Sequence, residues 1–418
     1  MTGDADVEGL DRPLGFTEAL CARWYDAIPR GLQVVAAALC TRPVEREDLV
    51  VAVEGIRTRH RAAASRIAEG ADGRLRYVPA EPATVTVAVA PAGARWRDRY
   101  AAQLTVPLDL SRALWRVELV PSPADAAVPA VVLVAGGHTL LDGISATTVV
   151  RELLHEPDDI AITAGPRLPA MEDLLPDSAP PAAPGLSPES DRWPVARPAP
   201  SASRTYGFAD RTVDHETTSR LQTRAHAEQT TIGALLGVAC TRARTVVPGA
   251  SDSLGFNVPY DVRPRVSPPL PAGCVGAYFG RAHLYTSGPS CDREPWSAAR
   301  DLSAQLHAEL AAMARPPAWN DGAIRALLAD LCRDDRASFD LGVMLTDLGV
   351  CELGPSVSAF FVTTVQTTGV EALVVSAASP AGGELCLGIG WPRPLIGNDT
   401  ARAYADELVA QIARLAHA

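Results

Sequence analysis

The sequence contains no lysine: all 38 residues counted as lysine or arginine are arginine. Without a lysine amine the chain cannot form a Schiff base with a carbonyl substrate, and it cannot supply the lysine of a phosphate-binding loop. Acidic residues outnumber the arginines by 49 to 38, which gives a formal net charge of −11. Nucleic-acid binding depends on an excess of basic groups that neutralise phosphates, so this balance argues against a nucleic-acid partner.

Other common signals are also missing. The eight cysteines are scattered without a CxxC pair, which is typical of buried thiols in a reducing cytosol rather than of disulfides or a zinc cluster. The histidines show no HExxH spacing, so no metal site is expected, and the GxSxG elbow of serine hydrolases is absent. The start, MTGDADVEGLDRP, is too polar for a secretory signal, and no run of about 18 uncharged apolar residues could span a membrane. We therefore expect a cytoplasmic protein.

A segment rich in proline, alanine and serine divides the chain. At about 150 residues per domain, 418 residues predict two or three domains. The stretch from Pro176 to Ser203 has few large apolar residues and is typical of an extended connection between lobes. We predict a first lobe at residues 1–171, a linker at 172–203 and a second lobe at 204–418.

Both lobes are predicted to mix helices with strands. In the first lobe, the spacing of apolar residues indicates a helix within 44–60 and a strand at 114–120. The apolar run 129–137 indicates a buried strand that ends in a glycine turn, and a helix should follow it at 144–154. For the second lobe we predict two helices within 215–245, strands at 252–260, 339–349, 358–366, 372–379 and 384–391, and a last helix within 398–418.

The strongest chemical signal is the segment GGHTLLDG, residues 136–143, between the predicted buried strand and the next helix. A histidine at the end of a core strand is held rigidly yet can face a cleft, and its ordinary pKa lies near neutral pH, as a general base requires. Asp142, followed by a glycine, suits a tight turn that fixes the loop carrying His138. A structural interpretation stays open, in which a carbonyl group satisfies His138 and Asp142 only caps the helix.

His138, Asp142 and Gly143 resemble the HHxxxDG signature of nonribosomal peptide synthetase condensation domains and of polyketide-associated acyltransferases of the phthiocerol dimycocerosyl transferase type. These families are part of the CoA-dependent acyltransferases related to chloramphenicol acetyltransferase. Further stretches that resemble this grouping are RPLGFTEAL, RTRHRAAASRI, VPLDLSRALWRVELV, FNVPYDVRPRVSPPLPAGCVGAYFG and MLTDLGVCELG. The resemblance covers most of the chain. It implies an α/β fold of two similar lobes, a pseudo-dimer in which each lobe is a mixed sheet with helices and a channel runs between the lobes.

The resemblance also implies a reaction. His138 would take the proton of an acceptor hydroxyl or amine as the acceptor attacks a thioester carbonyl, and backbone N–H groups near Gly143 would stabilise the oxyanion. The co-substrate would be an acyl-CoA or a phosphopantetheine thioester on an acyl carrier protein, with no permanently bound cofactor. The acceptor would be a small-molecule natural product or lipid. A monomer is plausible, because two lobes of one chain complete the channel.

Other residues are assigned supporting roles by the same resemblance. Asp142 would face away from the channel and pair with Arg263, with Arg265 as the alternative, to hold the loop without transferring a proton. Ser145 and Thr346 could form hydrogen bonds near the oxyanion or along the channel, although such hydroxyls more often bind local backbone.

The signature is incomplete at one position, because Gly137 stands where the family usually has its first histidine. The loss of that side chain would leave room or flexibility beside His138. It also keeps two other functions open: a catalytically silent module that recruits a carrier protein, and a fold recruited to a cyclisation. A carrier protein is acidic, so its docking surface should be basic; Arg57, Arg59, Arg61 and Arg66 form a candidate patch or, more simply, a solvated helix end.

Overall fold

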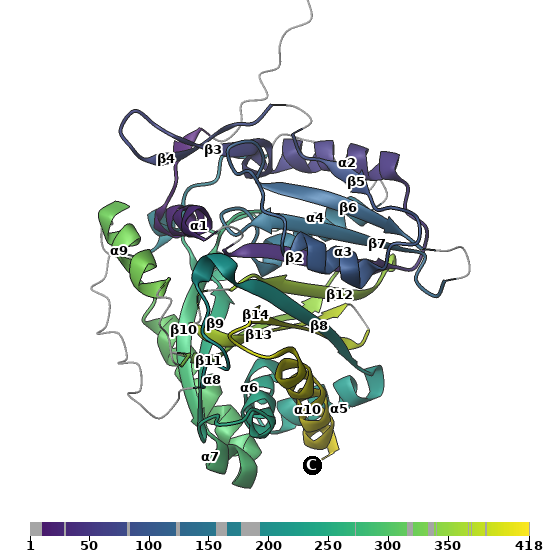
Figure 1. The fold of residues 1–418 in the computed structure, drawn as a ribbon, viewed down its shortest axis with the longest axis vertical. Helices are drawn as coiled ribbons and strands as arrows, with labels where there is room; N and C mark the ends of the chain where they lie inside the picture. The colour runs from purple at the N-terminus through teal and green to yellow at the C-terminus, as the bar shows by residue number, and fades with distance from the viewer. Residues whose placement is uncertain are drawn as a thin grey trace, which may run out of the picture.

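The structure is a computed structural model that describes residues 11–28, 31–81, 84–122, 126–155, 165–176, 193–271, 273–315, 321–332, 338–339, 341–366, 368, 370–380 and 383–417. Two lobes stand one above the other, the first built mainly from the N-terminal half and the second from the C-terminal half (Figure 1). Each lobe contains a mixed sheet with helices, as the sequence predicts. Half of the predicted linker, residues 177–192, lies outside the described residues.

The sheet of the first lobe has the strand order β12-β2-β7-β6-β5. Its strands are β12 (Val357–Thr364), β2 (Gln33–Cys40), β7 (Ala130–Gly137), β6 (Trp115–Pro121) and β5 (Val87–Val89). The central β7 is buried along its whole length, in agreement with its unbroken apolar sequence. A small sheet with the order β1-β4-β3 lies beside it, formed by β1 (Arg12–Pro13), β4 (Leu75–Pro79) and β3 (Ser65–Glu69).

Helices cover both faces of this first sheet. One face packs against α1 (Phe16–Ala27), α2 (Arg46–Arg59) and α4 (Gly143–Leu154) in a shared apolar core. The other face packs against α3 (Trp96–Gln103) and against apolar side chains of the second lobe, among them Met344 and Val374. The two lobes therefore share a core instead of meeting only at a solvated surface.

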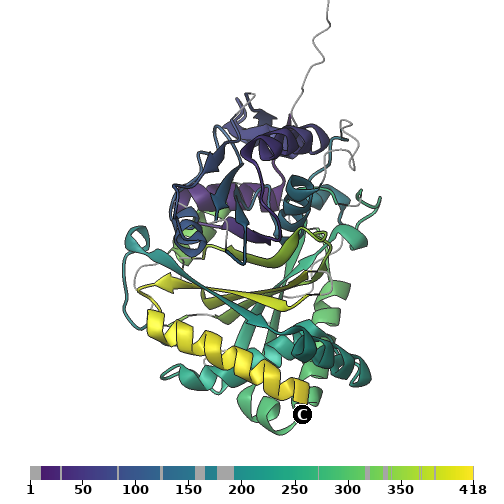
Figure 2. The ribbon, with the colours of Figure 1, turned by 90° about the vertical axis from the view of Figure 1, so that its right-hand side faces the viewer.

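The sheet of the second lobe has the order β10-β9-β11-β13-β14-β8. Its strands are β10 (Phe279–Ser287), β9 (Ser253–Asp261), β11 (Leu341–Cys351), β13 (Glu371–Pro380), β14 (Leu385–Arg393) and β8 (Thr205–Val213). The helices of this lobe are α5 (His215–Ala227), α6 (Ile232–Ala243), α7 (Gly288–Arg293), α8 (Pro295–Ala311) and α10 (Asn398–His417). Helix α9 (Asp321–Leu331) also belongs to the C-terminal half of the chain, but it packs against α1 in the core of the first lobe. Helices α5, α6, α8 and α10 share one core with the sheet and cover its face away from the first lobe (Figures 1 and 2).

One strand crosses between the lobes. Strand β12 belongs to the C-terminal half of the chain, yet it pairs antiparallel with β2, with Phe361 opposite Ala37. Phe360 of this strand is fully buried in the core of the first lobe. The predicted range 204–418 therefore supplies an edge strand to the sheet of the first lobe.

Strands β9 and β11 form a fork. They pair in parallel only at Val343 with Phe256 and Met344 with Asn257. Beyond these pairs β9 continues to Asp261 and β11 to Cys351. Because the two strands run in the same direction from this short contact, the fork is closed at Phe256 and open toward Asp261.

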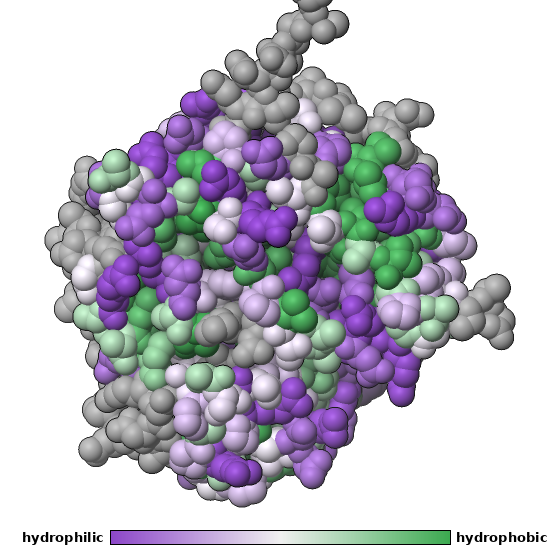
Figure 3. All heavy atoms as spheres, turned by 45° about the horizontal axis from the view of Figure 1, so that its top comes forward, coloured by the Kyte–Doolittle hydropathy of each residue, from purple (hydrophilic) through white to green (hydrophobic). Residues whose placement is uncertain are grey.

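The surface of the first lobe is mainly hydrophilic, with separate hydrophobic areas between charged residues (Figure 3). Exposed apolar side chains include Val50 and Val51 on α2 and Val89 on β5. Scattered side chains of this kind are normal on soluble surfaces and need no partner. Within the described part of the chain, no helix combines the length and apolar character that crossing a bilayer requires.

The crossing strand predicts that the first lobe cannot fold alone. A fragment of residues 1–176 would leave β2 as an unpaired edge and would lose the buried Phe360. We expect this fragment to show no cooperative thermal transition by circular dichroism. Adding residues 193–418 as a separate chain should restore the transition. A monomeric fragment 1–176 that melts as sharply as the full chain would contradict this prediction.

Candidate functional site

His138 is held between the lobes. It follows β7 directly, and its backbone N–H donates to the Leu32 carbonyl at 3.1 Å. Its ring stacks on Phe279 of the second lobe, with 4.4 Å between ring centroids and 28° between planes. A side chain stacked in this way has little rotational freedom, so the ring presents a defined edge to the space between the lobes.

Two cavities meet at His138. The first, which we call the chamber, has a volume of about 290 Å³ and reaches from His138 and Gly143 to Gly237 and Leu302. The second, which we call the vestibule, has a volume of about 650 Å³ and reaches from His138 along α1 to Ala308 and neighbouring residues of α8. Pro259, Tyr260, Phe279 and Met344 line both cavities together with His138. His138 therefore borders both cavities, as the expected active-site channel between the lobes requires.

The surroundings of His138 keep its imidazole neutral. Burial lowers the pKa of His138 to about 4, although the carboxylate of Asp142 acts in the opposite direction. The Nδ1 atom is buried without a hydrogen-bond partner among the described residues. This leaves Nε2 as the ring nitrogen that can face the cavities. At neutral pH the ring is unprotonated and can accept a proton there.

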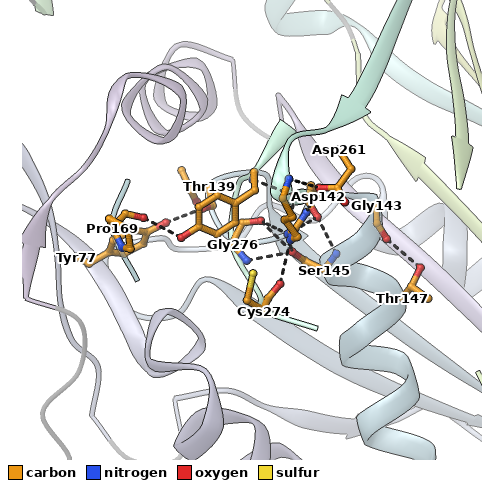
Figure 4. A network of polar contacts seen from close by, with 12 residues as sticks. Tyr77, Thr139, Asp142, Gly143, Ser145, Thr147, Pro169, Asp261, Cys274 and Gly276 are labelled. Atoms are coloured by element: carbon orange, nitrogen blue, oxygen red, sulfur yellow. Dashed lines mark hydrogen bonds and ion pairs between the residues drawn. The ribbon is translucent and has the colours of Figure 1, made fainter. Parts of the chain in front are cut away.

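Asp142 fixes the loop that carries His138. It is the N-cap of α4, and its Oδ1 accepts a hydrogen bond from the Ser145 N–H at 2.7 Å. Its Oδ2 accepts from the backbone N–H of Tyr278 at 3.0 Å and lies 2.9 Å from Nη2 of Arg263. Only 3% of the Asp142 surface is exposed, so its oxygens are satisfied by partners from both lobes. Figure 4 shows Asp142 and Ser145 of the first lobe drawn together with Gly276 and Cys274 of the second.

Arg263 is the partner of Asp142 from the second lobe. We call the contact among Asp142, Ser145 and Arg263 the interlobe clamp. Nη2 of Arg263 donates to the Ser145 hydroxyl at 2.9 Å and to the Gly276 carbonyl at 3.0 Å, and its Nη1 donates to Asp261 Oδ1 at 2.9 Å. Burial lowers the pKa of Arg263, but the carboxylates of Asp142 and Asp261 outweigh burial and raise it above its ordinary value. The alternative residue, Arg265, is exposed. The partner of Asp142 is therefore Arg263.

The other expected site residues lie in different places. Gly143 lines the chamber and is the first residue of α4, so its N–H is one of the amino-terminal donors that a helix leaves unpaired. Thr346 also lines the chamber. Ser145 is fully buried in the interlobe clamp, where its hydroxyl donates to the Gly276 carbonyl and accepts from the Gly276 N–H. Its hydroxyl is therefore occupied, and of these three residues only Gly143 and Thr346 line the chamber.

The space beside Gly137 is already filled. A Cβ atom at this position would lie 3.1 Å from Cδ2 of Leu110 and 3.3 Å from Oγ1 of Thr139. The expectation that the missing first histidine leaves room beside His138 is therefore wrong. Leu110 occupies the volume into which a side chain at position 137 would extend.

Most side chains of the candidate docking patch form contacts within the first lobe. Arg57 is buried, and the guanidinium of Arg59 lies 2.7 Å from Glu152. His60 also reaches Glu152, at 3.0 Å, and Arg61 donates to the Gly165 carbonyl at 2.9 Å. Both sequence interpretations of this cluster are thus wrong for Arg57 and Arg59: Arg59 joins α2 to α4, and the buried Arg57 donates to the Ala80 carbonyl.

The structure shows neither a disulfide nor a metal-binding cluster among the described residues. All eight cysteines lie in the described residues; none forms a disulfide, and all except Cys332 are buried, as the sequence predicts. Among the residues that the structure describes, no three His, Cys, Asp or Glu side chains converge as a metal ion would require.

Sequence reasoning missed Phe279, whose ring stacks on His138. It lies within the stretch FNVPYDVRPRVSPPLPAGCVGAYFG, but nothing in its spacing connects it to a residue far earlier in the chain. It also missed Leu110, which stands beside Gly137. Both contacts depend on how the lobes and loops pack.

Comparison with known proteins supports the resemblance. Residues 203–358 match the family described as phthiocerol/phthiodiolone dimycocerosyl transferase C-terminus. Comparison with the sequences of curated proteins gives no significant match. The agreement with the family model therefore covers part of the second lobe.

Several solved structures share the fold over almost the whole chain. Polyketide synthase associated protein 5 from Mycobacterium tuberculosis is 17% identical, with a TM-score of 0.66 over 96% of this chain and 97% of that one. The first condensation domain of the calcium-dependent antibiotic synthetase, in complex with a substrate analogue, is 14% identical, with a TM-score of 0.65 over 97% and 96%. The EpoB cyclization-docking bidomain from Sorangium cellulosum is 15% identical, with a TM-score of 0.65 over 97% and 84%. The fold of this chain is therefore that of condensation domains and their relatives.

The interlobe clamp predicts that Asp142→Ala destabilises the protein strongly. The substitution removes a helix cap and leaves the buried Arg263 without its interlobe carboxylate, which should cost about 3–5 kcal/mol in the free energy of unfolding. Asp214 is a matched control, because it caps α5 with the same contact, accepting from the Thr217 N–H at 2.8 Å, but is exposed. Asp214→Ala should cost clearly less, because it removes only an exposed helix cap. Equal losses in urea unfolding would show that Asp142 acts only as a cap.

The environment of His138 predicts an unusual titration. Its imidazole should titrate with a midpoint near pH 4, well below the ordinary value of 6.5, because burial penalises the charged ring. Between these two values the unfolded chain binds more protons than the folded one, so this group lowers stability as pH falls from about 6.5 to about 4. Histidine-resolved NMR across this range checks the midpoint, with His138→Ala identifying the signal. A midpoint near 6.5 would show that the ring is solvated.

Proposed function

We propose that this chain is an acyltransferase that moves an acyl group from a CoA or carrier-protein thioester to a hydroxyl, or to an amine, of a small molecule. The observation that carries the proposal is the position of His138, a neutral imidazole at the point where two cavities meet. Two substrates that must react with each other need such a meeting point, with a base between them.

The proposed step uses His138 as a general base. Nε2 accepts the proton of the acceptor hydroxyl while the acceptor oxygen forms a bond to the thioester carbonyl carbon. The tetrahedral intermediate then collapses, the carbon–sulfur bond breaks, and the imidazolium returns its proton to the leaving thiolate. The products are an ester and a free thiol, and an amine acceptor gives an amide by the same sequence.

The oxyanion of the intermediate needs a hydrogen-bond donor. Gly143 lines the chamber at the amino terminus of α4, where the helix dipole favours negative charge. We assign its backbone N–H to this role. Asp142 and Arg263 are positioning residues in this scheme, because they hold the loop and the helix start through the interlobe clamp.

The relatives with the same fold support this reaction class. They include a condensation domain that mediates chain release from the enacyloxin polyketide synthase and the condensation domain of the Monacolin K polyketide synthase. Condensation and acyl transfer both join a nucleophile to an activated acyl group. The proposal therefore includes a role in the biosynthesis of a natural product or lipid, with ester formation as its first alternative and amide formation as its second.

The test is a substitution at the base. With octanoyl-CoA as donor and octanol or octylamine as probe acceptors, we expect His138→Ala to reduce acceptor-dependent release of CoA thiol by about 10²–10⁴-fold. The variant should keep a cooperative thermal transition. His155→Ala is the control, because His155 lies at the opposite end of α4 and bonds the Arg151 carbonyl.

Two outcomes would overturn the proposal. Full activity of His138→Ala would remove the histidine from the chemistry. A wild-type protein that releases no thiol with CoA or carrier-protein thioesters, whatever acceptor is offered, but binds a carrier protein would indicate a silent recruitment module. Conversion of a bound chain to a ring without any added acceptor would indicate a cyclisation.

A further inference from the structure

We propose that the chamber holds the hydrocarbon chain of the acyl group, and that Gly237 on α6 sets the length of chain that fits. This inference rests on the proposed function, because the chain belongs to the acyl group that would be transferred. It goes further by naming the substrate class and the residue that selects it.

The fork between β9 and β11 gives the chamber its direction. Residues of β9 from Phe256 to Asp261 line it, and so do residues of β11 from Met344 to Leu348. The open end of the fork lies at Asp261, whose carboxylate bonds the clamp residue Arg263, and the closed end lies at Phe256. Five residue steps along a strand correspond to about 16 Å. The chamber is therefore an elongated space that leads from the base into the second lobe.

The closed end is apolar and is bounded by both layers of the second lobe. Helices α6 and α8 cover the sheet here, and the space lies between them and the fork. The apolar side chains that line it are Phe256, Val258, Leu284, Leu302, Leu306 and Leu345. Burial in such a lining favours a hydrocarbon chain in proportion to the apolar area removed from water.

The charged groups that line the chamber are already occupied. Arg263 forms ion pairs with both Asp142 and Asp261. Asp347 accepts a hydrogen bond from the Gly349 N–H at 2.9 Å and lies beside Gly233 at the start of α6. The part of the chamber that favours a hydrocarbon chain is therefore its apolar closed end.

Gly237 stands at the closed end. A Cβ atom there would lie 2.8 Å from Cδ1 of Leu302 and 3.8 Å from both Leu345 and Phe256. These three neighbours come from α8, β11 and β9, so position 237 is the point where both layers converge. A glycine inside a helix is less favourable than an alanine by about 1 kcal/mol, but here it lets the Leu302 side chain lie against α6, whereas a larger residue at position 237 would push Leu302 into the chamber.

The test uses straight-chain acyl-CoAs from acetyl to palmitoyl as probes, with binding measured by calorimetry. In the wild type, affinity should rise by about fourfold for each added methylene until the chamber is full, and then level off. Gly237→Val should make the affinity level off at a shorter chain. Leu302→Ala should make it level off at a longer chain, because it enlarges the same end. A general loss of structure cannot produce shifts in opposite directions.

Leu236→Ala is the matched control. Leu236 is the neighbour of Gly237 on α6 and is fully buried, but it does not line the chamber. Its loss should lower thermal stability and leave the chain-length profile unchanged.

An unchanged profile in Gly237→Val and Leu302→Ala would overturn this inference, and so would an effect of these variants only on the KM of the acceptor. Such results would leave the proposed function intact as long as His138→Ala still abolishes transfer. Conversely, the wild type could bind acyl-CoAs up to a limiting chain length but release no thiol. That result would support the acyl-chain site in the chamber and contradict the proposed acyltransferase function. The two failures are therefore distinguishable.

Discussion

The buried ion pair between Asp142 and Arg263 is the contact on which the rest of the site depends. It joins the loop after β7, the start of α4 and the segment before β10, which come from different lobes. A buried pair adds little stability by itself, because both charges lose their hydration. Its effect is geometric: the carboxylate can satisfy its partners only when the lobes are in one arrangement. That arrangement stacks Phe279 on His138 and brings the chamber and the vestibule together.

The same arrangement explains why the lobes cannot be separated. Strand β12 leaves the second lobe to complete the sheet of the first, and Met344 and Val374 pack into a core that both lobes share. The catalytic histidine of the proposed reaction lies at this junction rather than within either lobe. Burial there lowers the pKa of His138 and keeps the ring neutral. In this neutral form the ring can accept a proton.

The chamber exists because two neighbouring strands of the second sheet pair over only a short length. A continuous sheet would close the space between β9 and β11, but their pairing stops after Met344 and Asn257. The strands then diverge, and α6 and α8 cover the opening from the far side. The chamber therefore lies inside the lobe, where Gly237 and Leu302 can limit what enters. Specificity would come from helices and strands far along the chain from the HxxxDG segment.

The sequence alone determined the features of this protein that depend on neighbouring residues or on composition. The apolar run of β7, the glycine turn, the cap at Asp142 and the lack of lysine are short-range or compositional properties, and they placed His138 after a core strand before any contact was known. Only the tertiary structure decided which strand pairs with β2, that Leu110 fills the space beside Gly137, that Ser145 binds backbone, and where the fork opens. These features depend on packing between segments far apart in the chain. Periodicity along the sequence predicts local helices and strands, but it does not predict which distant segments come into contact.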